Sequence, residues 1–364
     1  MILCTQSTCA DTLTLRDKIG QMLLIGFEGK SIDQNAFIVK AIEEEHIGGV
    51  ILFDVHHRHK TCDKNIESPE QVQKLTQDLQ YVNRKANEQH RRPQTPLLIA
   101  VDYEGGLVSR LKETYGFPAT LSAEDIGQMS LMEADQHAYA MAMTLKTAGF
   151  NLNLAPVLDL NLNPSNPIIG ALQRSFSANP VDVIKYADIY SSNFLAQSVQ
   201  CAYKHFPGHG SSTSDSHLGF VDSSDVWQSQ ELEPYQKLLS KQSCGVIMTA
   251  HIVNRNLDDS GLPATLSHHV LTHILRERLH FSGVIMSDDM QMKAIADHFG
   301  LKHALILAIN AGVDLFIFGN QLPVVAQNPK ELIDIIESAV QLGHIKSSRI
   351  DEAYQHILNL KKSL

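Results

Sequence analysis

Eight short apolar runs recur along the whole of this 364-residue chain and constrain its fold more than any other feature. Each run is rich in Val, Ile, Leu and Phe, and most precede a stretch with helical periodicity. Their apolar character is continuous, which indicates strands covered on both faces, as in a parallel sheet wrapped by helices. The runs are Met22–Phe27, Gly49–Phe53, Leu97–Val101, Leu152–Leu158, Val199–Tyr203, Gly245–Thr249, Gly283–Met286 and Val313–Phe318. Eight such units predict an α/β fold, a closed (β/α)8 TIM barrel.

Helix signals occupy the segments between these runs. Ser68 and Pro69 offer an N-cap and a first-turn proline, and apolar residues follow at helical spacing from Val72. Further helices are predicted over Ile126–Leu145, Val181–Phe194, Val270–Leu279, His303–Ile309 and Leu332–Val340, with a C-terminal closing helix over Ile350–Leu360. No linker or shift of composition divides the chain, so we expect a single domain.

The first ten residues, MILCTQSTCA, are expected to form a tail outside the barrel, which would occupy residues 11–364. Their small residues resemble the end of an export signal, but the basic and fully apolar segments of such a signal are missing. We therefore expect a cytoplasmic protein, with export as the alternative if residues 1–10 are the remnant of a signal peptide.

Composition excludes several classes of partner. With 43% hydrophobic and 19% charged residues the chain is typical of a globular protein, and no apolar run reaches the ~20 residues of a membrane span. The net charge of −10 argues against a nucleic-acid surface, because phosphate binding depends on clustered Lys and Arg. We expect a small neutral or anionic ligand, with neither nucleic acid nor membrane as a partner.

The five cysteines are odd in number and lack CxxC spacing, which predicts neither a full disulfide framework nor a thiolate zinc site. Cys201 and Cys244 lie in or beside strand-like runs, so we expect them to be buried apolar side chains.

Polar residues follow the ends of the predicted strands, and in a barrel those ends open into one mouth where catalytic groups usually lie. A strand that reaches water is generally followed by polar residues, so single positions carry little weight. The whole set is more specific, because several carboxylates converge with a Lys-His pair. It consists of Asp54, Asp102, Asp159, Lys204 with His205, His251, Asp288 with Asp289, and Asn320.

Sugar hydrolysis is a reaction that uses such a mouth without a metal. A retaining mechanism needs one carboxylate to attack the anomeric carbon and a second group to transfer protons. Asp288 follows the run ending at Met286 and would stand rigidly at a strand end, which suits a nucleophile. Asp289 would point elsewhere, as an orienting or structural group.

The chain resembles glycoside hydrolase family 3, and within it the single-domain bacterial β-N-acetylglucosaminidases (β-N-acetylhexosaminidases) of peptidoglycan recycling. The matching segments lie in the family's order and are VDYEGGLVSRL at Val101–Leu111, QRSFSANP at Gln173–Pro180, KHFPGHGSSTSDSH at Lys204–His217, MTAHI at Met248–Ile252, PATLS at Pro263–Ser267 and MSDDMQM at Met286–Met292. The resemblance implies retaining exo-hydrolysis of terminal β-linked N-acetylglucosamine. The expected substrate is a carbohydrate, either a muropeptide or an N-acetylglucosaminide, with no cofactor and no metal, and the expected enzyme is a monomer.

Carried over residue by residue, the resemblance implies that Asp288 forms the covalent glycosyl-enzyme intermediate. It also implies that His217 is the general acid/base and that Asp215 hydrogen-bonds to it. A histidine with an ordinary pKa near ~6.5 suits both proton transfers near neutral pH. The donor sugar would be held by Asp102, Arg110, Arg174, Lys204 and His205. The chain departs from the family at Leu107, where an arginine is usual.

Alternatives remain at several positions. A metal-dependent barrel hydrolase would use His205, His251 and Asp288 as ligands, a sugar-binding protein without catalysis would keep the pocket alone, and phosphate could replace water as the acceptor. His209 is expected to be a structural hydrogen-bonding residue, and Glu104 to brace Arg110 or a loop amide. The histidines 56, 57 and 59 are expected to form a solvated loop, since they lack recognised ligand spacing.

Overall fold

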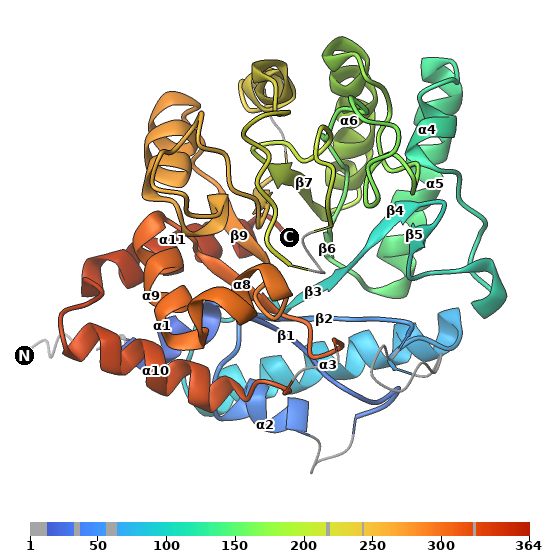
Figure 1. Cartoon of the computed structure of the whole chain (residues 1–364). Helices are drawn as coiled ribbons and strands as arrows, with labels where there is room; N and C mark the ends of the chain where they lie inside the picture. The colour runs from blue at the N-terminus through green and yellow to red at the C-terminus, as the bar shows by residue number, and fades with distance from the viewer. Residues whose placement is uncertain (1–12, 33–36, 56–63, 216–218, 242–243, 323–324) are drawn as a thin grey trace, which may run out of the picture.

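Eight parallel strands close into a barrel in the computed structural model, which describes residues 13–32, 37–55, 64–215, 219–241, 244–322 and 325–364 (Figure 1). Around the barrel the order is β1-β10-β9-β8-β7-β6-β3-β2. The strands are β1 (Leu23–Gly26), β2 (Gly49–Ile51), β3 (Leu98–Val101), β6 (Leu152–Asn153), β7 (Gln200–Phe206), β8 (Val246–Thr249), β9 (Val284–Asp289) and β10 (Leu315–Phe318). Each predicted run overlaps one of them, so the (β/α)8 barrel expected from the sequence is confirmed.

Two strands extend beyond the runs that predicted them. β7 continues through Lys204 and His205 to Phe206, and β9 continues through Asp288 to Asp289. These polar side chains therefore belong to regular strands and not to loops, and side chains on strands are positioned more precisely.

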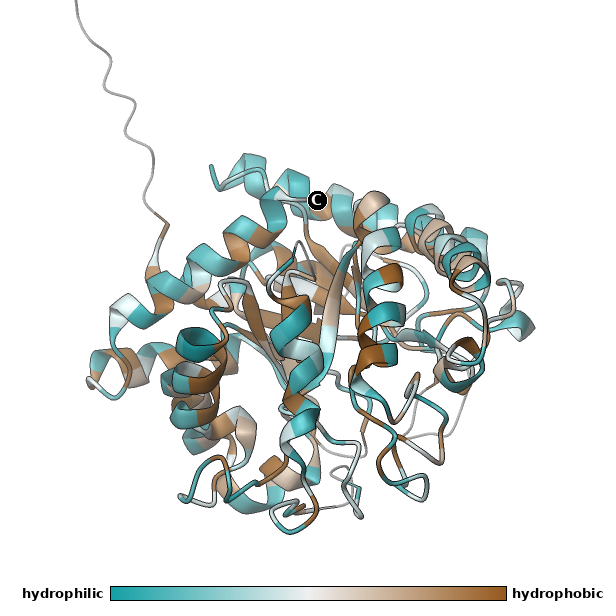
Figure 2. Ribbon diagram, turned by 90° about the horizontal axis from the view of Figure 1, so that it is seen from above, coloured by the Kyte–Doolittle hydropathy of each residue, from teal (hydrophilic) through white to brown (hydrophobic). Residues whose placement is uncertain are grey.

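The helices form an outer ring around the strands. They are α1 (Leu15–Gln21), α2 (Phe37–Glu43), α3 (Pro69–Gln89), α4 (Ala123–Ile126), α5 (Leu131–Ala148), α6 (Pro180–Ala196), α7 (Glu233–Leu238), α8 (Lys293–Phe299), α9 (Leu301–Ala311), α10 (Pro329–Gln341) and α11 (Ser347–Lys362). Short 3₁₀ helices are η1 (Glu113–Tyr115), η2 (Ser229–Leu232) and η3 (Ala264–Leu266), and η4 (His269–Arg278) is a π-helix. Seen from above, the central strands are apolar and polar residues concentrate on the outward sides of the helices (Figure 2). The core is thus the barrel interior and the layer between strands and helices. Within the described residues, no helix has the length and apolarity to cross a membrane.

Two local features differ from the expected helices and loops. The single helix expected over Ile126–Leu145 is divided, because Ser130 caps a new helix and forms a reciprocal capping box with Glu133. An antiparallel hairpin of β4 (Tyr103–Gly105) and β5 (Val108–Ser109) follows β3 outside the barrel sheet. The sequence reasoning did not anticipate this hairpin.

Cys201 and Cys244 form a disulfide, with their Cα atoms 4.8 Å apart. The expectation that both are buried is confirmed, but the expectation that they act as simple apolar thiols is wrong. The cause is topological. Cys201 lies near the start of β7 and Cys244 just before β8, and these two strands are neighbours in the sheet.

Candidate active site

A cavity of about 500 Å³ opens at the carboxyl ends of the barrel strands. Its lining brings together seven of the eight residues predicted for the site, namely Asp102, Arg110, Arg174, Lys204, His205, Asp215 and Asp288. They come from β3, the β4–β5 hairpin, the loop after β6, β7 and the segment after it, and β9. His217, the eighth, lies outside the described residues.

A network of alternating charges forms the floor of the cavity. Lys204 is almost fully buried, and its Nζ lies 2.9 Å from Asp102 Oδ1 and 2.6 Å from Glu104 Oε1. Arg110 Nη2 approaches the other oxygen of Asp102 at 3.4 Å. Arg174 donates to both carboxylate oxygens of Glu104, at 2.7 Å each. Glu104 therefore braces Arg174 and Lys204, and not Arg110, which the sequence analysis offered as its partner.

These pairs keep every member of the network charged. Burial alone would raise the pKa of Asp102, but Lys204 and Arg110 outweigh it and hold that pKa well below its usual range. Burial would lower the pKa of Lys204, whereas Asp102 and Glu104 raise it above its ordinary value. The floor thus presents fixed donors and acceptors of both signs, which suits a neutral molecule rich in hydroxyl groups.

His205 is held in one tautomer by two neighbours. Its Nε2 lies 3.3 Å from Arg174 Nη2, and because a guanidinium can only donate, Nε2 must accept. The proton is therefore on Nδ1, which donates to Asp159 Oδ2 at 2.6 Å. Asp159 also accepts from the backbone N–H groups of His205 and His209. Asp159 is buried and orients a ring that lines the cavity, a role that sequence reasoning left undecided.

His209 agrees with the structural role expected for it. Its backbone N–H is fixed on Asp159, and its Nδ1 lies 2.8 Å from Ser212 Oγ. Burial lowers the pKa of His209 to about 4, so its ring is neutral near pH 7. Its side chain lines the cavity but is tied into the segment that follows β7.

Glu231, on η2, was not singled out by the sequence reasoning and anchors that same segment. Its carboxylate accepts from Ser211 Oγ at 2.6 Å and from the backbone N–H groups of Gly210 and Gln228, at 3.1 and 3.2 Å. Burial raises the pKa of Glu231 to about 7, against the opposing effect of these hydrogen bonds. Glu231 therefore anchors the chain at Ser211, which is only four positions before Asp215.

Both carboxylates at the end of β9 line the cavity, so the expectation that Asp289 points elsewhere is wrong. Asp288 lines the cavity, and its Oδ1 accepts from the backbone N–H of Asp289 at 2.8 Å. Asp289 accepts from the backbone N–H of Gln291. His251 is buried, and its Nε2 donates to the main-chain oxygen of Asp289 at 3.1 Å. His251 therefore supports the strand end that carries Asp288 and is not among the described residues that line the cavity.

Two strand-end residues do not join the site. Asp54 is buried in an ion pair with Lys112, at 2.5 Å. Asn320 bonds the main-chain oxygens of Gly26 and Gln327 and the side chain of Gln291. Both are polar groups that finish a strand, as expected for a position taken singly.

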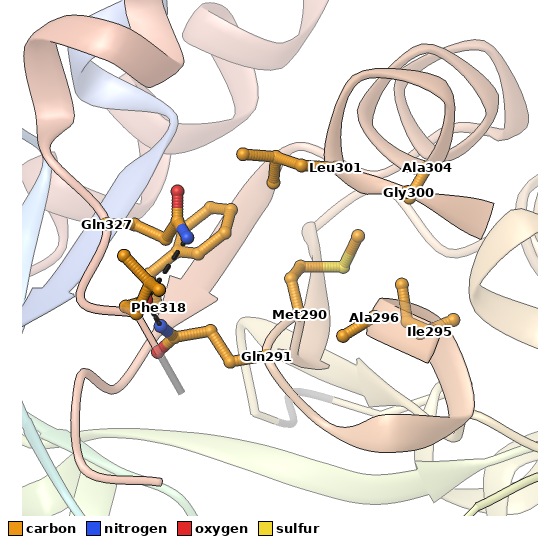
Figure 3. Close-up of a pocket in the computed structure, with 10 residues that line it drawn as sticks. Met290, Gln291, Ile295, Ala296, Gly300, Leu301, Ala304, Phe318 and Gln327 are labelled. Atoms are coloured by element: carbon orange, nitrogen blue, oxygen red, sulfur yellow. Dashed lines mark hydrogen bonds between the residues drawn. The ribbon is translucent and has the colours of Figure 1, made fainter. Parts of the chain in front are cut away.

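A second, smaller cavity of about 130 Å³ lies beside the β9 end, toward α8 and α9 (Figure 3). Met290, Leu301 and Phe318 contribute apolar side chains, and Gln291 donates to the main-chain oxygen of Val325. Its described lining carries no charged side chain and shares no residue with the larger cavity. Of these two cavities, only the larger has charged side chains among its described lining residues.

Residues 14–360 match the family described as "Glycosyl hydrolase family 3 N terminal domain". The chain belongs to glycosyl hydrolase family 3. One relative is the Beta-hexosaminidase A of Pseudoalteromonas piscicida, 32% identical over 348 residues that cover 89% of this chain and 54% of that protein. The Beta-hexosaminidase of Haemophilus influenzae is 32% identical over 315 residues, which cover 84% and 81%. The chain spans about half the length of the first relative and about four fifths of the second.

Two solved structures are similar to this chain over nearly its whole length. A family 3 beta-N-acetylglucosaminidase from a Paenibacillus species matches with a TM-score of 0.84 and 31% identity, over 96% of this chain and 62% of that one. The Beta-N-acetylhexosaminidase of Beutenbergia cavernae matches with a TM-score of 0.84 and 25% identity, over 97% and 99%. The expected family and fold are therefore both confirmed.

Proposed function

We propose that the protein is a retaining exo-β-N-acetylglucosaminidase that acts through a covalent glycosyl-aspartate. The observation that carries this proposal is the convergence of Asp288, Asp215 and the five expected sugar-binding residues on one cavity. The relatives named above as hexosaminidases and N-acetylglucosaminidases support the same activity. Residues 11–364 would form the catalytic domain.

The charged floor would bind the terminal sugar. Asp102 would accept from ring hydroxyls, while Arg110, Lys204 and Arg174 would donate. His205 would act only as an acceptor, through Nε2, because its proton is on Nδ1 and is donated to Asp159. Since these groups are already paired with one another, they need little reorganisation when a sugar binds.

Two displacements at the anomeric carbon would complete the reaction. The Asp288 carboxylate forms a bond to that carbon as the glycosidic bond breaks, and His217 gives its proton to the departing oxygen. His217 then takes a proton from water, whose oxygen displaces Asp288 and releases the sugar. Asp215 would stabilise protonated His217, since a neighbouring carboxylate favours the charged imidazole.

Asp288→Ala tests the nucleophile. We expect at least about a 10⁴-fold loss of kcat/KM on an aryl N-acetyl-β-glucosaminide, with an unchanged thermal unfolding curve. Asp225→Ala, at an exposed aspartate outside the cavity, is the matched control. Proton NMR of the first product should show the β-anomer. Persistent activity of Asp288→Ala, or release of the α-anomer, contradicts the mechanism.

The acid/base role of His217 has a different signature. We expect His217→Ala to slow hydrolysis by ~10²–10⁴ for a poor leaving group and by much less for an activated aryl group, which needs no proton. An equal loss on both kinds of substrate would contradict this role. The same assays with and without phosphate identify the acceptor, since a phosphorolytic enzyme would form a sugar phosphate.

The metal-dependent alternative has weaker support. Both ring nitrogens of His205 face protein groups, and His251 donates to a backbone oxygen. His205 and His251 would have to give up these bonds before they could bind a metal ion together with Asp288. Insensitivity of the purified protein to a chelator would eliminate this alternative. A sugar-binding protein without catalysis would bind N-acetylglucosamine but turn over no glycoside in a panel that includes glucoside, xyloside and N-acetylgalactosaminide.

The natural substrate, assembly and compartment are further parts of the proposal. The resemblance implies peptidoglycan fragments, a monomer and no nucleic-acid partner. For the compartment, cytoplasm is the first expectation, but the Cys201–Cys244 disulfide supports the export alternative, because disulfides persist mainly in oxidising compartments. Peptide mapping of protein isolated from its source, alkylated before lysis, would distinguish the two.

A further inference from the structure

Leu107 is an exposed apolar side chain at the mouth of the charged cavity. Its side chain is 64% exposed, and it lines the same cavity as Asp102, Arg110 and Asp288. Single exposed leucines are ordinary on protein surfaces. This one differs because a rigid structure presents it beside a site that is otherwise polar.

The β4–β5 hairpin supplies that rigidity. Tyr103 is fully buried, and the side chain of Asn153 bonds both its backbone N–H and its C=O, at 3.1 and 3.0 Å. Gly105 pairs with Val108, so Leu107 lies in the turn between them. A Cβ atom on Gly105, whose φ is +105°, would come within 2.2 Å of the main-chain oxygen of Leu121, which shows how closely the hairpin packs there.

A second apolar wall lies on the loop after β6. Pro167, Ile168 and Leu172 line the cavity, directly before Arg174 in the sequence. This loop is held by the same support as the hairpin, because the N–H of Glu124 in α4 donates to the main-chain oxygen of Gln173 at 3.2 Å. The segment from Leu121 to Glu124 therefore braces both walls, and neither has to be ordered when a ligand arrives.

The charges around the cavity favour an uncharged occupant between these walls. Among the described lining residues the cationic side chains are Arg110, Lys204 and Arg174, and each is paired with a carboxylate of the floor. Among these described residues, no cation is left unpaired for a leaving group that carries a carboxylate. A pyranose without charge would instead lay the apolar C–H face of its ring on the leucine.

We propose that Leu107 and the wall from Pro167 to Leu172 form the leaving-group subsite, and that it selects an uncharged sugar over an acidic one. This inference rests on the proposed N-acetylglucosaminidase activity, and it favours neutral oligosaccharides over the peptidoglycan fragments that the family resemblance implies. The preferred substrates are neutral β-linked N-acetylglucosamine oligosaccharides, and glycosides whose leaving group carries a lactyl or peptide carboxylate are poorer ones.

The test compares kcat/KM for N,N′-diacetylchitobiose with that for an N-acetylglucosaminyl-N-acetylmuramic acid disaccharide. The wild type should prefer the neutral disaccharide, and Leu107→Arg should lower the ratio of the two values by about tenfold, a change typical of one altered pocket contact. Leu107→Ala should lower kcat/KM on the neutral disaccharide mainly through KM. Leu342→Arg, at another exposed leucine on the surface, is the matched control and should leave the ratio unchanged.

The outcomes separate this inference from the function on which it rests. If an aryl N-acetylglucosaminide is not hydrolysed by the wild type, the proposed function fails. If that glycoside is hydrolysed while Leu107→Arg keeps the wild-type ratio, or the wild type prefers the acidic disaccharide, only the inference about the subsite is overturned. Because Leu107 is exposed, its substitutions should leave the thermal unfolding of the protein unchanged, which a melting curve of each variant verifies.

Discussion

Arg174 and Glu104 face each other as a bidentate ion pair, with Nε and Nη2 each 2.7 Å from a carboxylate oxygen. The pair is buried and lies 70 positions apart in the sequence. Glu104 also receives Lys204, so a single carboxylate positions two of the cations that the proposed function assigns to sugar binding. Such planar pairing fixes direction as well as distance.

Glu104→Gln should therefore weaken both stability and sugar binding. Removing one partner of a buried pair typically lowers the free energy of unfolding by about 3–5 kcal/mol. We expect a higher KM for the aryl glycoside with a smaller change in kcat. Glu104→Asp, which keeps the charge, should recover part of the loss, and Glu88→Gln at an exposed glutamate is the control. Steady-state kinetics and urea unfolding measure both effects, and a variant with wild-type KM would show that the pair does not position the site.

Asp159→Asn tests the tautomer of His205. The asparagine amide would be able to donate to Nδ1, which would move the ring proton to Nε2 and set it against the guanidinium of Arg174. An unmet buried hydrogen bond costs about 1–3 kcal/mol, so we expect kcat/KM to fall by about 10- to 100-fold. Nitrogen-15 chemical shifts of the His205 ring should exchange between Nδ1 and Nε2. Unchanged shifts would mean that Asp159 does not set the tautomer.

Glu231 should make the stability of the protein depend on pH. Burial raises its pKa to about 7 in the folded state, whereas an unfolded chain has the ordinary value of 4.5, and Asp159 and Tyr235 face the same carboxyl. Between these two pH values the folded state binds more protons than the unfolded state, so the free energy of unfolding falls as pH rises. Glu231→Gln lacks this titration, and from pH 4.5 to 7 the wild type should lose up to about 3 kcal/mol relative to it.

Urea unfolding of both proteins at a series of pH values measures this difference. Other buried groups, such as His209 with its lowered pKa, contribute to both proteins and cancel in the comparison. A difference in stability that stays constant across the window would refute the raised pKa of Glu231.

The Cys201–Cys244 disulfide should stabilise the barrel measurably. It links residues 43 positions apart, and closing such a loop restricts the unfolded chain. The double variant Cys201→Ala, Cys244→Ala should unfold with a free energy lower by about 2–4 kcal/mol. Wild type in dithiothreitol should match the double variant. If the oxidised and reduced wild types unfold at the same urea concentration, the disulfide does not contribute to stability.

The barrel could be predicted because each strand can be recognised from its local sequence. A run such as Leu97–Val101 is apolar on both faces, and eight such runs leave few other architectures. The strand-end carboxylates followed from that topology. Glu104, Asp159 and Glu231 could not be given their roles in this way, because their partners lie far along the chain and only the folded geometry selects them.

Two missed features did carry a signal. Gly105-Gly106 between Tyr103 and Val108 is a pair typical of a hairpin turn, and it marks β4–β5. The disulfide followed from topology, since one cysteine precedes or begins each of two consecutive barrel strands, and consecutive strands of this fold are neighbours. Combining the predicted strand order with the cysteine positions would have brought Cys201 and Cys244 together.

The separation of the β4–β5 turn from the barrel sheet has an evolutionary consequence. Asp288, the proposed nucleophile, and Lys204, a proposed sugar-binding residue, lie on the barrel strands β9 and β7, whereas Leu107 lies in an exposed turn. If the proposed subsite is correct, a single substitution at Leu107 would change which leaving group fits, while the proposed nucleophile and sugar-binding residues stay the same. The preference for a leaving group would then be able to change at one position, independently of the reaction itself.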